Sequence, residues 1–133
     1  MIDPVDRTLR RWRQSHFIWG AADCMLSIGD YIAERGGEDV TGMFRGTYSN
    51  SIGAMRHMRR FGGVGGLIGM TGIEKIDGPP QRGDVVALIT PDCEGGEIGA
   101  ICTGDTIAAR QMRGVAEIQT RFVRWSGVWR CPV

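Results

Sequence analysis

Apolar residues in the first half of the chain recur every three or four positions, which is typical of amphipathic helices. This spacing predicts helices over residues 4–15, 24–35 and 52–61, and a one-turn helix over residues 67–70. The residues expected to face a core are Val5, Leu9, Trp12, Met25, Ile28, Tyr31, Ile32, Ile52, Met55, Met58 and Phe61. Good capping residues stand before the three long helices, because an Asp or Asn side chain can accept hydrogen bonds from a free first turn.

From residue 73 onward the pattern changes to short apolar runs separated by Gly, Pro and Asp, which favours strands and tight turns. The predicted strands cover residues 73–76, 83–89, 98–103, 106–110, 115–118, 122–125 and 128–130, with a hairpin loop over residues 91–96. Helices followed by strands predict an α+β fold, with N-terminal helices packed on one side of a C-terminal antiparallel sheet. The length of 133 residues fits one domain over residues 1–133.

Composition narrows the function classes. With 42% hydrophobic and 23% charged residues and a net charge of +1, the chain reads as a globular protein, and no charge imbalance favours nucleic acid. No apolar run approaches the roughly 20 residues of a membrane span, and the first residues lack a signal-peptide pattern. The four cysteines have no CxxC spacing, so we expect no metal and no cofactor.

The sequence Trp19-Gly20-Ala21-Ala22-Asp23-Cys24 places a cysteine at the start of the second predicted helix. Asp23 is the expected cap, and the positive end of the helix dipole at Cys24 favours a thiolate. A cysteine in this position is either a nucleophile or a small core residue. A later turn, residues 45–48, is expected to pack Tyr48 back on the body of the protein.

Three motifs in this order resemble the papain-like cell-wall cysteine peptidases of the NlpC type. Trp19-Gly20-x-x-Asp23-Cys24 is similar to the family's turn before the nucleophile helix, and Gly83-Asp84-Val85-Val86 to its first sheet strand. Ile98-Gly99-Ala100-Ile101 followed by Gly104-Asp105 is similar to its hydrophobic-Gly strand and turn. The resemblance spans residues 5–130 and implies a papain-like fold with Cys24 in the nucleophile position.

One position departs from this pattern. The family's general base is a histidine just before the hydrophobic-Gly pair, where this chain has Glu97, and the third polar residue falls near Ala109 or Arg110. A carboxylate near Cys24 would disfavour a thiolate, whereas an imidazole would accept its proton. His16 is the candidate substitute base because it precedes Cys24 by eight residues; His57 is expected on the arginine-rich face of the third helix.

Trp125 and Trp129 near the C-terminus add a likeness to a phage and prophage family of small proteins. It implies a protein made in the bacterial cytoplasm that joins a phage or phage-derived tail particle, with other tail-tip or hub proteins and peptidoglycan as partners. Two functions stay open: a catalytically degenerate structural component, or an active cysteine hydrolase that cleaves peptidoglycan stem peptides. A small regulatory binding module is a third. We expect Cys24 to be mostly protonated at neutral pH, and both tryptophans to contribute to an apolar surface patch.

Overall fold

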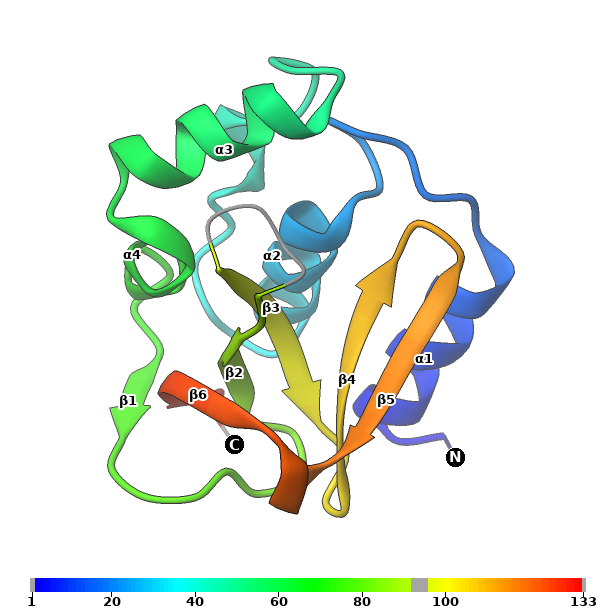
Figure 1. The fold of residues 1–133 in the computed structure, drawn as a ribbon, viewed down its shortest axis with the longest axis vertical. Coiled ribbons are helices and arrows are strands. Elements are labelled where there is room, and N and C mark those ends of the chain that lie inside the picture. Colours follow the sequence, from blue (N-terminus) through cyan, green and yellow to red (C-terminus); the bar gives the residue numbers. More distant parts are fainter. Residues whose placement is uncertain (1, 92–95, 133) are drawn as a thin grey trace.

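Four α-helices precede six strands in the computed structural model of this protein (Figure 1), which describes residues 2–91 and 96–132. The helices are α1 (Pro4–Gln14), α2 (Cys24–Glu34), α3 (Ser51–Arg60) and α4 (Gly63–Gly69), with short 3-10 turns η1 (Thr41–Met43) and η2 (Thr120–Phe122). No helix within the described ranges is long and apolar enough to cross a membrane. The predicted α+β class is therefore confirmed.

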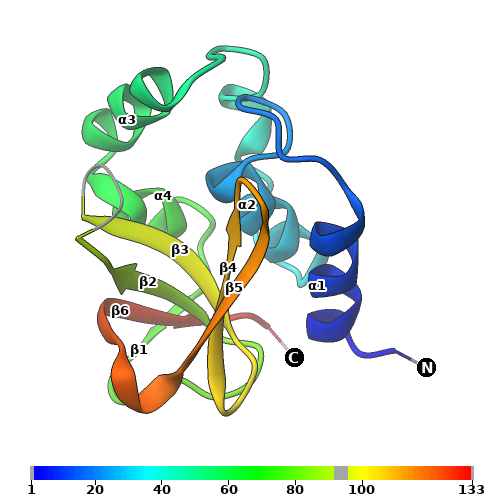
Figure 2. The ribbon, with the colours of Figure 1, turned by 45° about the vertical axis from the view of Figure 1, so that its right-hand side comes forward.

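The strands form a single antiparallel sheet in the order β1-β6-β2-β3-β4-β5. They are β1 (Glu74–Ile76), β2 (Val85–Ile89), β3 (Glu97–Cys102), β4 (Thr106–Gln111), β5 (Gly114–Gln119) and β6 (Arg124–Arg130). The sheet is strongly twisted, and the β4–β5 hairpin crosses the direction of β2 and β3 (Figure 2). The predicted hairpin loop between β2 and β3 lies mostly at residues 92–95, outside the described residues.

Side-chain caps fix the beginnings of the long helices, as their sequences predict. Asp3 accepts a hydrogen bond from the Asp6 amide at 2.9 Å, and Asn50 accepts one from the Gly53 amide at 2.9 Å. Each cap satisfies one of the amides that have no partner inside the helix. The starts of α1 and α3 are therefore set by local chemistry.

Helix α2 packs directly across β3 and β4, and α1 packs against β5 (Figure 2). The close approach of α2 depends on Gly99, because a Cβ atom there would lie 3.0 Å from Cγ1 of Ile28. The main core joins α1, α2 and the sheet through Val5, Leu9, Trp12, Ile28, Tyr31, Ile32, Val85, Ala87, Ile101 and Trp129. Gly99 of the predicted hydrophobic-Gly strand thus has a packing role that needs no catalysis.

Helices α3 and α4 pack on each other, and α3 stands over the upper end of α2 (Figures 1 and 2). A separate cluster of buried Leu26, Phe44 and Leu67 ties α2, the following connector and α4 together. The side chains of Met25, Met58 and Phe61 are partly buried and pack against that cluster. The two N-terminal helices therefore cover the sheet, whereas α3 covers helices.

The structure corrects two predicted elements. The fourth helix begins at Gly63 rather than at Leu67, because Gly62 adopts a left-handed φ of 87° that ends α3 and lets a new helix start at once. A Cβ atom at Gly66 would lie 1.8 Å from the Phe61 carbonyl oxygen, so this tight junction requires glycine. The two predicted C-terminal strands are one strand, β6, whose pairing with β2 shifts register between Ala87 and Leu88.

Asp84 anchors the start of the sheet. Its side chain is buried and accepts two hydrogen bonds from Arg130, from Nε to Oδ1 and from Nη2 to Oδ2, each 2.9 Å long. The Gln81 amide donates to Oδ2 as well, at 2.8 Å. This network gives Asp84 of the Gly-Asp motif a structural role.

The expectation that Trp129 contributes to an apolar surface patch is wrong. Its side chain is buried in the main core against Gly65 and Gly127, and the Lys75 ammonium lies 5.6 Å from its ring centroid. Trp125 is half-buried and packs on the second apolar cluster of the sheet. The large apolar side chains that are most exposed are instead Met43, Ile52, Met112 and Phe122.

Candidate functional site

Cys24 is the first residue of α2 and is half-buried against apolar residues of the sheet. The residue before it, Asp23, is fully buried and caps the helix: Oδ1 accepts from the Leu26 amide at 2.8 Å. Oδ2 accepts from the Gly20 amide at 2.9 Å, which closes the turn. The predicted cap is confirmed, and the buried carboxylate fixes the position of the cysteine.

Tyr48 holds this turn from the connector that follows α2. Its hydroxyl donates a hydrogen bond to Oδ2 of Asp23. Burial, the bond to Asp23 and the nearby Cys24 all raise the pKa of Tyr48 well above its ordinary value. The phenol therefore stays protonated and remains a donor, and the expectation that Tyr48 packs back on the body is confirmed.

Gly20 is required where the connector crosses the turn. Its φ of 79° is left-handed, and a Cβ atom there would lie 2.0 Å from the Tyr48 carbonyl oxygen. The Gly20 carbonyl in turn accepts from the Gly46 amide at 2.8 Å. The Trp-Gly sequence is thus explained by the close approach of two backbone segments.

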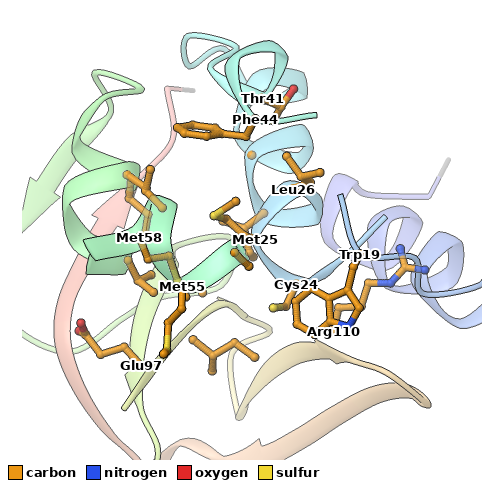
Figure 3. A pocket seen from close by; sticks show the side chains of 18 of the residues that line it. Trp19, Cys24, Met25, Leu26, Thr41, Phe44, Met55, Met58, Glu97 and Arg110 are labelled. Atoms are coloured by element: carbon orange, nitrogen blue, oxygen red, sulfur yellow. The ribbon is translucent and has the colours of Figure 1, made fainter. Parts of the chain in front are cut away.

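Cys24 opens onto a pocket of about 260 Å³ between α2, α3, α4 and the ends of β3 and β4 (Figure 3). The lining is mostly apolar and includes Met25, Met55, Met58, Phe17, Trp19, Phe44, Val64, Leu67 and Met112. Its polar lining residues include Glu97, Arg110, Thr41 and Thr71. A concave, apolar site with a few polar groups is the usual form of a small-molecule site.

Glu97, which the sequence resemblance aligns with the histidine of the NlpC-type peptidases, lines this pocket on the side away from Cys24 (Figure 3). Its carboxylate accepts a hydrogen bond from the Ser126 hydroxyl on β6. It also lies at the start of α4, since a Cβ atom at Gly63 would stand 3.3 Å from its Oε1. A carboxylate at a helix start is favourable, so Glu97 has a structural explanation.

Arg110, near which the resemblance predicted a third polar residue, is a buried cation with 4% of its surface exposed. Its Nη1 donates to Oγ of Ser27 at 3.3 Å, and its Nη2 donates to the carbonyl oxygen and Oγ of Ser15 at 3.2 and 2.9 Å. Burial lowers the pKa of Arg110, and the charge of Asp23 opposes that shift. Arg110 joins the end of α1 to α2 beside Cys24.

The two histidines of the chain lie elsewhere. His16 is exposed on the segment after α1 and does not line the pocket, whereas its neighbour Phe17 does. His57 is half-buried on α3, with its ring centroid 5.2 Å from that of Phe44 and 5.5 Å from that of Tyr48. Its Nε2 lies 3.0 Å from Oγ1 of Thr47. The structure thus places Glu97 and Cys24 on one pocket but neither histidine.

Within residues 2–91 and 96–132, no group of three or more His, Cys, Asp or Glu side chains is arranged to hold a metal ion. The model of a family described as a domain of unknown function, DUF6950, matches residues 3–131. The chain belongs to the DUF6950 family. No curated protein and no solved structure matches this DUF6950 chain.

Sequence reasoning missed part of the surroundings of Cys24 in this DUF6950 chain. Arg110 is buried and contacts Ser15 and Ser27, and its place on a predicted strand gives no sign of either feature. Met55 and Met58 line the pocket, and Met58 also packs against the core as predicted. The cluster of methionines on two helices was the available signal, because flexible side chains favour adaptable surfaces.

Proposed function

We propose that this DUF6950 protein is a papain-like domain of the NlpC type that has lost the peptidase reaction and serves as a structural part of a phage, or phage-derived, tail tip. The fold supports the first half of the proposal. A helix that begins at Cys24 packs on an antiparallel sheet drawn from residues 74–130, in the order of elements that the resemblance implies.

One observation carries the loss of activity. The residue in the position of the general base, Glu97, is bonded to Ser126 and lies by the start of α4, across the pocket from Cys24. A cysteine peptidase needs an imidazole that accepts the thiol proton and later donates it to the leaving group. Glu97 supplies neither step from that position.

The charges around Cys24 also support the loss of peptidase activity. Asp23 places a buried carboxylate one residue away, and three hydrogen bonds stabilise its negative charge, which disfavours a second negative charge on the thiol. The guanidinium of Arg110 is the opposing charge, and it donates hydrogen bonds to Ser15 and Ser27. The helix end adds only about 0.3–1 kcal/mol in favour of a thiolate.

An active hydrolase is the second candidate, because Cys24 stands at a helix start on an open pocket. In that case Cys24 is the nucleophile, its own backbone amide helps to hold the oxyanion, and cleavage of a peptidoglycan stem-peptide amide is the reaction. His16 would have to act as base by reaching the thiol from an exposed position.

Two measurements on the full chain test the proposal. The purified protein should release no more peptide from peptidoglycan than its Cys24→Ala variant, and mass spectrometry of purified particles from the host should detect the protein. Peptide release that depends on Cys24 would establish the hydrolase instead. Absence from particles, with a monomeric free chain at high concentration, would reject the structural role.

A further inference from the structure

The pocket at Cys24 extends along α2 for more than two turns of the helix. The α2 residues that line it are Cys24, Met25, Leu26, Ile28, Gly29 and Ile32. At a rise of 1.5 Å per residue, the eight steps from Cys24 to Ile32 correspond to about 12 Å. The pocket is therefore longer than a single apolar side chain.

We propose that this pocket binds a linear alkyl chain, the apolar part of a fatty acid or lipid, laid along α2. This goes beyond the function proposed above and holds whether or not the chain is part of a particle. The volume of about 260 Å³ exceeds the roughly 150 Å³ of an apolar cavity that accepts benzene. A length of about 12 Å accommodates about eight to ten carbons, since each bond of ~1.5 Å runs at an angle to the chain axis.

The chemistry of the lining favours an alkyl chain over a peptide. A peptide backbone must find partners for its N–H and C=O groups when it is buried. Here four of the polar lining side chains already bond to the protein, among them Thr71 Oγ1 to the Ile68 carbonyl and Thr41 Oγ1 to Asp39. Arg110 and Glu97 are bonded as well. An occupant without polar groups needs no hydrogen-bond partner from the lining.

Methionines form two walls of the pocket. Met25 comes from α2, and Met55 and Met58 come from α3, which stands over α2 (Figure 3). An unbranched thioether side chain adapts to an irregular or flexible occupant. This lining suits a chain with many rotamers better than a rigid ring.

The polar end of the ligand belongs at the Cys24 end of the pocket. Phe17 and Trp19 are half-buried there, and Gln111 and Met112 are exposed to solvent at the end of β4. The other end lies against buried Phe44 and Thr41. A head group therefore meets water near Cys24, with the chain end towards Phe44.

The test measures binding of the sodium salts of hexanoate to hexadecanoate, below their micelle concentrations, by calorimetry and by tryptophan fluorescence. Affinity should rise about fourfold per added methylene, which corresponds to ~0.8 kcal/mol each, and should level off near ten carbons. A rise that continues unchanged to hexadecanoate indicates detergent-like adsorption and overturns the proposal.

A matched pair of variants on α3 localises the binding. Met55→Trp fills the pocket and should weaken decanoate binding by tenfold or more. Ile52→Trp adds the same bulk at a residue that is 58% exposed and outside the pocket, so affinity should stay within twofold. Equal affinities in two variants with native circular dichroism contradict the proposal.

A photoactivatable fatty acid covers the case in which Met55→Trp does not fold. Its label on the wild-type protein should map by mass spectrometry to Met25, Met55 or Met58, and label confined to other segments refutes the site.

Sedimentation with phosphatidylglycerol vesicles separates the two sources of the chain: loss of sedimentation in Met55→Trp identifies a lipid chain, and no sedimentation of the wild type identifies a free fatty acid. Neither assay depends on hydrolysis or on particles.

Discussion

Removal of the Tyr48 hydroxyl by Tyr48→Phe is expected to destabilise the turn that carries Cys24. The hydroxyl donates to Oδ2 of Asp23, a residue with 0% of its surface exposed. A hydrogen bond to a charged group contributes about 1.5–3 kcal/mol. Because Oδ2 keeps the Gly20 amide and the ring keeps its contact with His57, we expect the lower part of that range, about 1.5–2 kcal/mol.

Urea denaturation of the full chain measures this loss, with the slope m compared between variants so that a change in midpoint reports stability. The matched control is the same substitution in an Asp23→Asn background, where the carboxylate that accepts the Tyr48 hydrogen bond is replaced by a neutral amide. There the cost of Tyr48→Phe should fall by at least about 1 kcal/mol, the coupling expected of residues in direct contact. A cost below about 0.5 kcal/mol in the wild-type background, or equal costs in both backgrounds, refutes the proposed role of Tyr48.

Two further variants test the packing of α1 and α2. Thr8→Val should stabilise the protein by up to about 1 kcal/mol in urea, because the buried Thr8 Oγ1 has no hydrogen-bond partner within the described residues; a clear loss of stability would show that the hydroxyl is bonded. Burial raises the pKa of Tyr31 from 10.0 to about 12, so the unfolded chain loses this proton first as pH rises. The contribution of Tyr31 to stability should therefore be intact below pH 10 and fall between pH 10 and 12, by up to about 2.7 kcal/mol, so the fall in this range should be smaller in Tyr31→Phe.

The elements could be predicted from the sequence because local chemistry sets their ends. Asp3 and Asp23 begin helices through bonds to amides three residues away, and Gly36, with a left-handed φ of 100°, follows the end of α2. The start of α4 could not be predicted, since it depends on the contact between Gly66 and the Phe61 carbonyl. The single strand β6 depends likewise on its pairing with β2.

The candidate site could be predicted only in part. The position of Cys24 followed from the helix pattern, but its surroundings come from residues far apart in the sequence. Arg110 reaches Ser15 and Ser27, and Tyr48 reaches Asp23, through the tertiary fold alone. The sequence also suggested that the Glu97 carboxylate would lie near Cys24. Only the structure shows that this side chain points towards Ser126 and α4.

The loss of the peptidase reaction is tested most directly by the reactivity of Cys24. The measurement is the rate of iodoacetamide labelling at Cys24 across pH 5–10, resolved from the other cysteines by mass spectrometry, with Cys24→Ala as the control. Our account predicts slow labelling at neutral pH and a midpoint near or above the ordinary cysteine value of about 8.5. Rapid labelling with a midpoint well below 7, together with peptide release from peptidoglycan that is lost in Cys24→Ala, would contradict it and identify an active hydrolase.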